Sequence, residues 1–242
     1  MTSMKYEART YRNLISKNNL KSYNVAIAES DLFISSDVNL ASEAKKSLLH
    51  HRLLLENYIK KHPQFLSSLL PLPEDGLAPP IVRDMLINSN ICGVGPMAAV
   101  AGSIAQFVGN DLFDLTETLI IENGGDIYLK SKEKLTVSVY AGKSPLSYKV
   151  NFIVKPKNTP FGICTSSATV GPSLSFGKAD AVCVLSKSAT LADAAASAIG
   201  NNVKSKNDIK KALDFGIKIK GVTGIIIILG SEMGAIGEVE FV

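Results

Sequence analysis

The chain has no tryptophan and little cysteine. Its three cysteines, Cys92, Cys164 and Cys183, lie far apart, and no two of them form a Cys-x-x-Cys pair. This spacing excludes a disulfide framework and a zinc knuckle, because both need cysteines that pair or cluster. We therefore expect a protein that works in a reducing compartment.

Long apolar runs and clustered charges are also missing. The longest apolar run, 224–230, is far too short to cross a bilayer. The first residues contain neither an apolar signal-peptide core nor a lipidation cysteine. Lysine and arginine exceed aspartate and glutamate by 26 − 22 = 4, and these charges are spread along the chain. We expect a cytoplasmic protein with neither a membrane nor a nucleic-acid partner, and with a slight preference for an anionic ligand.

What the chain does have is enough apolar sequence for a substantial core, with 46% hydrophobic and 20% charged residues. We interpret residues 1–242 as a single α+β domain with mostly antiparallel sheets packed with helices, because strands outnumber helices and follow one another as meanders. The expected strands are 6–15, 24–35, 118–121, 127–129, 135–141, 149–154, 161–164, 181–185, 225–229 and 236–242. The expected helices are 38–62, 81–89, 97–108, 191–199 and 206–215, with a proline-rich connector at 71–80.

A first candidate site lies where Gly93-Val94-Gly95-Pro96 precedes a helix. Glycines before a helix N-terminus leave backbone N–H groups open to an anion, so Gly93 and Gly95 are candidate ligand-binding residues. The alternative is an ordinary loop into a buried helix, because the motif lacks the full dinucleotide fingerprint and no strand clearly precedes it.

A second candidate is the Asn123-Gly124-Gly125-Asp126 segment between two expected strands. Paired glycines bring backbone N–H groups forward with no side chain in the way, so a pyrophosphate or ribose can approach. The alternative is a plain hairpin turn that Asp126 caps, since these residue types are favoured in such turns.

A third candidate is the hydroxyl-rich loop of Thr165, Ser166 and Ser167. It can line a phosphate or carboxylate site, or it can be only a capping cluster. Ser166, Ser167 and the nearby Lys178 are the candidate catalytic groups. A nucleophilic serine needs a base, which disfavours a Ser-His-Asp hydrolase, because the only histidines are expected to face solvent on the long N-terminal helix, at His50, His51 and His62.

A fourth candidate is the pair Asp193 and Ser197, which are four residues apart on an expected helix and therefore share a face. Together with a backbone carbonyl and phosphate oxygens, these two oxygen donors can hold Mg²⁺. The alternative is that Asp193 lies in the first turn of its helix and compensates the dipole of that helix, with Ser197 as a packing residue.

In this order the motifs resemble those of the ApbE superfamily of magnesium-dependent flavin transferases, over residues 92–201. Shared features are a glycine-rich loop into a small-residue helix, an Asn-Gly-Gly turn, a Ser/Thr loop and an Asp-x-x-x-Ser helix start. The chain is more similar still to an ApbE-related branch of unknown function. That branch shares the Cys-Thr-Ser-Ser loop, the stretch 175–181 and the long N-terminal helix.

The resemblance implies contacts from Asn123, Gly124 and Gly125 to a flavin dinucleotide. It also implies that Thr165, Ser166 and Ser167 line the same cleft and that Asp193 and Ser197 ligate Mg²⁺. The chain departs from the transferases in two places. Pro96-Met97 replaces their Lys-Gly, and residues 171–177 replace a block with the histidine implicated in proton transfer. These departures argue against covalent flavin transfer by the route of those enzymes.

We therefore expect a cleft that binds FAD or a related flavin or adenine nucleotide with Mg²⁺. If the protein is an enzyme, the resemblance implies phosphoryl or pyrophosphate transfer. The alternative is a catalytically silent ligand-binding or scaffold protein that kept the ApbE fold without the histidine. The sequence leaves a protein acceptor and homo-oligomerisation open.

Overall fold

The structure is a computed structural model that describes residues 20–155, 157–170 and 175–242. Two parts of the sequence interpretation lie outside these ranges. They are the strand expected at 6–15 and residues 171–174 of the segment that replaces the histidine block.

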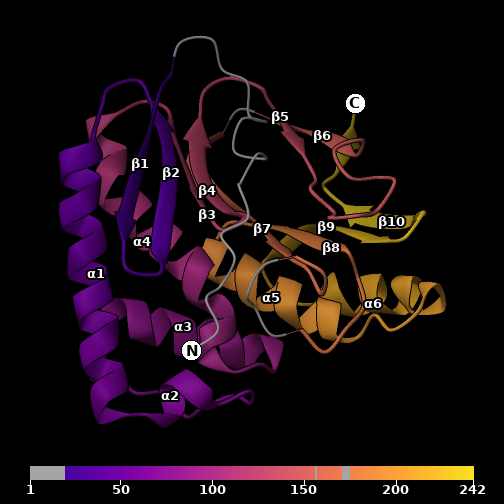
Figure 1. The fold of residues 1–242 in the computed structure, drawn as a ribbon, viewed down its shortest axis with the longest axis horizontal. Helices are drawn as coiled ribbons and strands as arrows, with labels where there is room; N and C mark the ends of the chain where they lie inside the picture. Colours follow the sequence, from indigo (N-terminus) through magenta and orange to yellow (C-terminus); the bar gives the residue numbers. More distant parts are fainter. Residues whose placement is uncertain (1–19, 156, 171–174) are drawn as a thin grey trace.

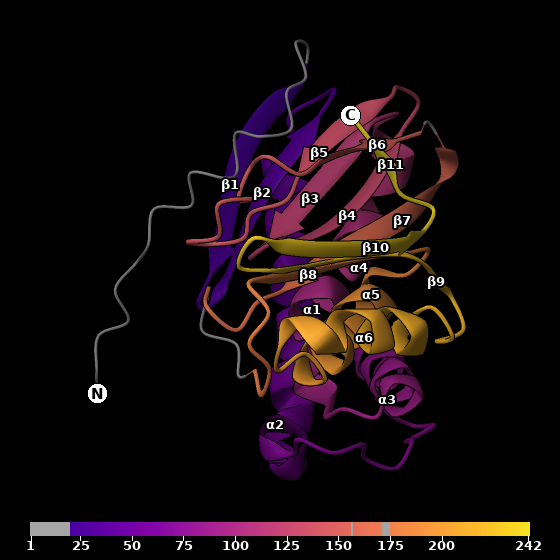
Figure 2. The ribbon, with the colours of Figure 1, turned by 90° about the vertical axis from the view of Figure 1, so that its right-hand side faces the viewer.

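A large antiparallel sheet divides the molecule into two layers of core. Its eight strands have the order β1-β2-β3-β4-β7-β8-β9-β10, and each neighbouring pair is antiparallel. The helices cover one face of this sheet, and a small sheet of β11, β6 and β5 lies over the other face (Figure 1). Figure 2 shows the same layers from the side. The expected α+β class with mostly antiparallel sheets is confirmed.

The element bounds follow the chain from the first described strand. The strands are β1 (Lys21–Ile27), β2 (Ser30–Ser36), β3 (Leu119–Asn123), β4 (Asp126–Ser131), β5 (Leu135–Ser138), β6 (Asn151–Val154), β7 (Lys157–Ser166), β8 (Ala181–Ser186), β9 (Val222–Leu229), β10 (Glu232–Gly237) and β11 (Glu240–Phe241). The helices are α1 (Ala41–Lys61), α2 (Gln64–Ser67), α3 (Pro80–Cys92), α4 (Val100–Leu112), α5 (Ala189–Asn201) and α6 (Ile209–Gly216). Short 3-10 helices are η2 (Pro96–Ala99), η3 (Phe113–Leu115) and η4 (Lys206–Asp208).

The continuous apolar runs in β8 and β9 come from a sheet that is covered on both faces. Val182 and Val184 belong to the core under the helices, whereas Cys183 and Leu185 belong to the core under the small sheet. Successive side chains point to opposite faces of a strand. A strand buried on both faces therefore shows no polar alternation.

Three elements differ from the sequence interpretation by more than their bounds. The single strand expected at 24–35 is the hairpin of β1 and β2, in which Ala28 takes a positive φ of 50° between the two strands. The helix expected at 97–108 starts as the 3-10 turn Pro96–Ala99 and becomes α-helical only at Val100. The last strand, expected at 236–242, is split into β10 and β11, because Gly237 takes a left-handed φ of 86° and turns the chain toward the small sheet.

No single helix in the described residues is long and apolar enough to span a membrane. The segments 80–92 and 96–115 reach that length only together, and they meet at a bend of 103°.

Helix α5 lies unusually close to the sheet and to α4. A Cβ placed on Gly162 of β7 would lie 2.4 Å from the Cα of Ala189, at the start of α5. A Cβ placed on Gly102 of α4 would lie 2.4 Å from the carbonyl oxygen of the same residue. Neither position tolerates a side chain without a backbone shift, so both glycines set the depth at which α5 is buried.

Replacing Gly162 by alanine is expected to lower the free energy of unfolding by about 2–3 kcal/mol, because the new methyl group overlaps the α5 backbone. For a chain of this length, that corresponds to a melting temperature lower by roughly 5–10 °C. Gly76→Ala is the matched control, since a Cβ on Gly76 meets no atom within 4 Å. Differential scanning calorimetry of both variants tests this, and equal melting temperatures would contradict the close approach.

Candidate functional site

The site is built around Asp193, which lies in the second turn of α5. Ser188 caps α5 by accepting a hydrogen bond from the backbone N–H of Leu191. The Asp193 carboxylate instead caps the neighbouring helix α4. Its Oδ2 accepts a hydrogen bond from Gly102 N, at the start of α4, at a distance of 2.9 Å. The alternative interpretation, that Asp193 lies in the first turn of its own helix, is wrong, because α5 begins at Ala189. The dipole that it compensates is that of α4.

The Asn123–Asp126 turn lies against the same end of α4. Gly124 and Gly125 have φ values of 67° and 103°, and Asn123 pairs with Asp126, so the segment is a two-residue hairpin turn. The Asn123 amide donates a hydrogen bond to Ala101 O at 3.0 Å, which ties the turn to α4. Gly125 N donates to Glu122 Oε1 at 2.7 Å. The Gly125 N–H therefore already has a partner within the turn. Gly124, in contrast, is exposed to solvent.

Asp126 places a second carboxyl group beside Asp193. Asp126 is 6% exposed, and its Oδ1 accepts a hydrogen bond from Thr165 N at 3.1 Å. Burial, and then the nearby charge of Asp193, raise the pKa of Asp126 well above its ordinary value. Burial also raises the pKa of Asp193 to about 7, against the opposing hydrogen bonds from Gly102, Asp126 and Ala101. Both shifts favour a proton held between the two carboxyls over two separate negative charges.

The donor set at this pair fits a divalent cation. None of the ion pairs in the described part of the chain reaches Asp126 or Asp193. A cation could therefore replace the shared proton without competing with a lysine or arginine. Asp193 is half-buried, so its site is open to solvent on one side. Within the described ranges no group of three or more His, Cys, Asp or Glu side chains could hold a metal. Mg²⁺ would therefore complete its shell with water or phosphate oxygens, as it does in nucleotide sites.

The Ser/Thr segment divides between the two faces of β7. Cys164 lies on the α5 side, where its Sγ donates to Ala189 O at 3.3 Å. Ser166 lies on the same side, with its Oγ 4.0 Å from the position of a Cβ on Gly200. Thr165 pairs with Cys183 across the strands, and its backbone N–H holds Asp126. Ser167 lies beyond the strand, where its Oγ accepts hydrogen bonds from Thr169 N and Val170 N, as in a polar turn.

Three sequence-predicted residues have structural explanations. Gly93 ends α3 in the left-handed conformation with φ 71°. Gly95 packs against the backbone of Ser68, whose oxygen would lie 1.9 Å from a Cβ. Lys178 is exposed, and its backbone N–H donates to Val203 O at 2.8 Å. Ser197 is half-buried one turn after Asp193 on α5.

The histidines lie elsewhere. His51 is buried where α1 meets α4, and its Nε2 is 2.9 Å from Asp111 Oδ2, near the far end of α4 from Gly102. His50 contacts the His51 ring, and His62 stacks on Tyr58. The expectation that all three face solvent is wrong for His51. Leu48, His51 and Leu55 follow helical spacing on the buried face of α1, and this spacing is the sequence signal that His51 is buried.

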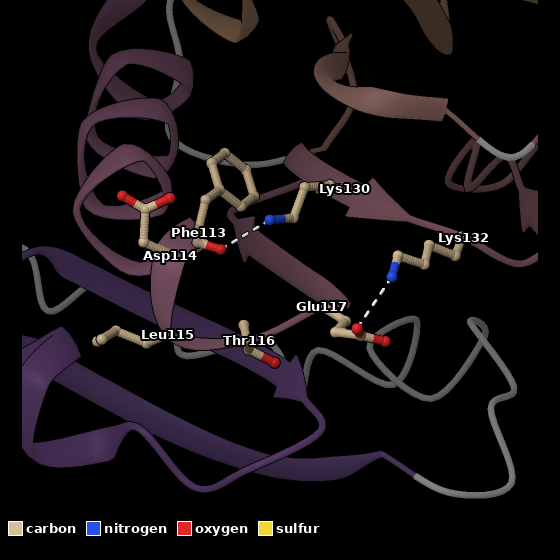
Figure 3. A pocket seen from close by; sticks show the side chains of 7 residues that line it. All are labelled: Phe113, Asp114, Leu115, Thr116, Glu117, Lys130 and Lys132. Atoms are coloured by element: carbon tan, nitrogen blue, oxygen red, sulfur yellow. Dashed lines mark hydrogen bonds and ion pairs between the residues drawn. The ribbon is translucent and has the colours of Figure 1, made fainter.

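A pocket lies at the opposite end of β4 from Asp126 (Figure 3). Lys130 and Lys132 point into it from β4 and the turn after it, toward the segment 113–117. Lys130 Nζ donates to Phe113 O at 2.7 Å, and Lys132 pairs with Glu117 at 2.9 Å. Four residues of strand separate Lys130 from Asp126, or roughly 13 Å. The pocket contains none of the sequence-predicted site residues.

Comparisons with known proteins agree with this architecture. A family model described as AbpE bacteria matches residues 12–240. A UPF0280 protein of Methanococcus aeolicus is 39% identical over 224 residues, which cover 89% of each chain. A UPF0280 protein of Methanosphaera stadtmanae is 38% identical over 228 residues, which cover 92% of each.

Two solved structures share the fold at low sequence identity. The crystal structure of the Pseudomonas stutzeri flavinyl transferase ApbE in its apo form is 13% identical, with a TM-score of 0.53 over 92% of this chain and 95% of that one. The ApbE protein of Thermotoga maritima is also 13% identical, with a TM-score of 0.56 over 88% of this chain and 96% of that one. At this identity the likeness concerns the fold alone.

Proposed function

The chain belongs to the family described as AbpE bacteria, and from this premise we propose that it binds a flavin nucleotide such as FAD through Mg²⁺ held at Asp193 and Asp126. The supporting observation is that buried Asp126 and half-buried Asp193, both with raised pKa values, lie side by side at the start of α4. A carboxyl pair that cannot ionise fully without a counter-ion is the arrangement that a divalent cation stabilises.

Each residue of the proposed site has a separate task. Asp193 and Asp126 supply carboxylate oxygens, and Ser197 adds a hydroxyl on the same face of α5. Asn123 holds the turn against α4, and the exposed Gly124 leaves room for a phosphate or ribose to approach. Ser166 lines the α5 side of the cleft. When bound, Mg²⁺ supplies Lewis-acid polarisation of a phosphate oxygen.

The chemistry that this site favours is attack on the FAD pyrophosphate with AMP as the leaving group. Attack by water gives FMN and AMP, and attack by an acceptor hydroxyl gives an FMN-modified acceptor and AMP. The structural neighbour from Pseudomonas stutzeri is a flavinyl transferase, so a protein acceptor is the corresponding proposal for this chain.

A competing candidate is a flavin-nucleotide binder without turnover. The positions of the three histidines favour it, because none is near Asp193 to act as a base.

Incubation with FAD and Mg²⁺ separates the two candidates. We expect FAD to raise the melting temperature of the protein only when Mg²⁺ is present, since a ligand of the native state stabilises it. Release of AMP, with FMN either released or attached to protein, would identify an enzyme by chromatography, whereas binding without release would identify the silent binder. FAD that binds equally well in EDTA would contradict the proposed role of the cation.

A further inference from the structure

Helices α4 and α5 cap each other's N-termini. Asp193 of α5 accepts the hydrogen bond from Gly102 N in the first turn of α4. Gln106, one turn farther along α4, returns the interaction: its Oε1 accepts from Ala189 N at 2.7 Å and from Thr190 N at 3.4 Å. The first N–H groups of a helix have no partner within it. Each helix therefore supplies the acceptor that the other lacks.

The amide of Gln106 is oriented by a half-buried aspartate of α3, Asp84. Gln106 Nε2 donates to Asp84 Oδ2 at 3.0 Å, which directs the amide oxygen toward α5. Thr190 Oγ1 donates to the same carboxylate oxygen at 2.6 Å, and Asn88 Nδ2 donates to Oδ1 at 2.9 Å. Asp84 thus holds Gln106 and Thr190 together and ties α3 to the start of α5.

The backbone at the start of α5 packs closely on both sides, so a small displacement there carries the whole helix with it. Ala189 is in close contact with Gly162 on one side and Gly102 on the other. Asp193 is one turn farther along the same helix. A displacement of the α5 start therefore moves the Asp193 carboxylate away from Gly102 and from Asp126.

We propose that Gln106, oriented by Asp84, is the positioning residue that holds the Asp193 carboxylate against α4 and beside Asp126. Gln106 is not placed at the cation or the nucleotide; it acts through the start of α5. The position of Asp193 is a property of the metal-free protein. The effect on cation affinity rests on the proposed function.

Gln106→Leu tests the proposal, because leucine removes the acceptor while keeping a side chain of similar length. In the metal-free protein we expect the Gly102 amide to exchange its hydrogen about tenfold faster than in the wild type, measured by NMR. In calorimetric titrations with Mg²⁺ alone we expect a dissociation constant weaker by about 10–100-fold, as for other residues that orient a metal ligand. Val108→Ala is the matched control. It removes buried volume from the same helix without touching α5's N-terminus.

A double variant, Asp84→Asn with Gln106→Glu, tests whether the acceptor can be restored. The new carboxylate at position 106 still accepts from the α5 backbone, and the new amide at position 84 donates to it, while the Thr190 hydroxyl loses its acceptor on residue 84. We expect both readouts to return most of the way toward wild-type values. Unchanged Gly102 exchange in Gln106→Leu would overturn the proposal, as would an equal loss of Mg²⁺ affinity in Val108→Ala. If wild-type protein does not bind Mg²⁺, the proposed function fails, and the exchange experiment still decides the role of Gln106.

Discussion

Replacing Asp193 by asparagine is expected to abolish Mg²⁺-dependent binding of FAD while the protein stays folded. The asparagine oxygen can still accept the hydrogen bond from Gly102 N, so the start of α4 keeps its cap. The proposed cation site, however, loses the charge of the carboxylate that is open to solvent. Since residues that only orient a metal ligand change affinity by about 10–100-fold, we expect a loss of more than about 100-fold for the ligand itself.

Calorimetric titration of FAD in the presence of Mg²⁺ measures this loss, and the melting temperature of the variant without ligand reports on folding. Asp214→Asn is the matched control, because it is the same substitution at an α6 position where the carboxylate pairs with Lys210 on the surface. An Asp193→Asn protein that binds FAD with wild-type affinity would remove Asp193 from the cation site. It would leave the residue as a cap for α4.

The second large effect is a loss of stability of the metal-free protein as the pH rises from about 4 to about 8. An acid whose pKa is raised by folding contributes its full stability below its unfolded pKa and loses it as the pH rises through the folded pKa. A pKa raised from 3.8 to about 7, as for Asp193, corresponds to about 4 kcal/mol by linkage. The raised pKa of Asp126 acts in the same direction.

Asp126→Asn isolates this contribution from all other titrating groups. Asparagine can accept from Thr165 N with its oxygen and donate to Asp193 with its nitrogen, so the hydrogen bonds are kept and the second charge is removed. We expect the variant to be more stable than metal-free wild type at pH 8 by about 2–4 kcal/mol, and nearly equal to it at pH 4. Urea unfolding at the two pH values measures the difference. Parallel wild-type and variant curves would show that the two carboxyls do not share a proton.

The sequence predicts those parts of the fold that depend on local patterns, such as strands and hairpin turns. Alternation and turn residues identified the β3–β4 hairpin, because Asn-Gly-Gly between apolar segments satisfies the left-handed φ values of that turn. The order of the strands within the sheet is not recorded in this way. It depends on pairings such as β2 with β3, which join residues far apart in the chain.

The proposed site could be anticipated from the sequence only in part, because it depends on contacts across the fold. Asp193 was singled out from its helix, but its partners Gly102 and Asp126 lie on α4 and at the start of β4. Asp126 was interpreted only as a turn residue; an acid directly after a Gly-Gly turn was the one signal of a second carboxyl. Gly93 and Gly95 look in the sequence like a glycine-rich ligand loop. In the structure, Gly93 ends α3 in the left-handed conformation, and Gly95 packs against the backbone of Ser68.

The cation site at Asp126 and Asp193 is best tested by a calorimetric titration of Mg²⁺ into metal-free wild-type protein at pH 7, repeated in two buffers of different ionisation enthalpy. We predict binding at one site with release of a proton, because the cation replaces the proton that Asp126 and Asp193 share. We predict no such binding for Asp193→Asn. Absence of binding to the wild type, or binding that both proteins share, would contradict the assignment of this carboxyl pair as a cation site.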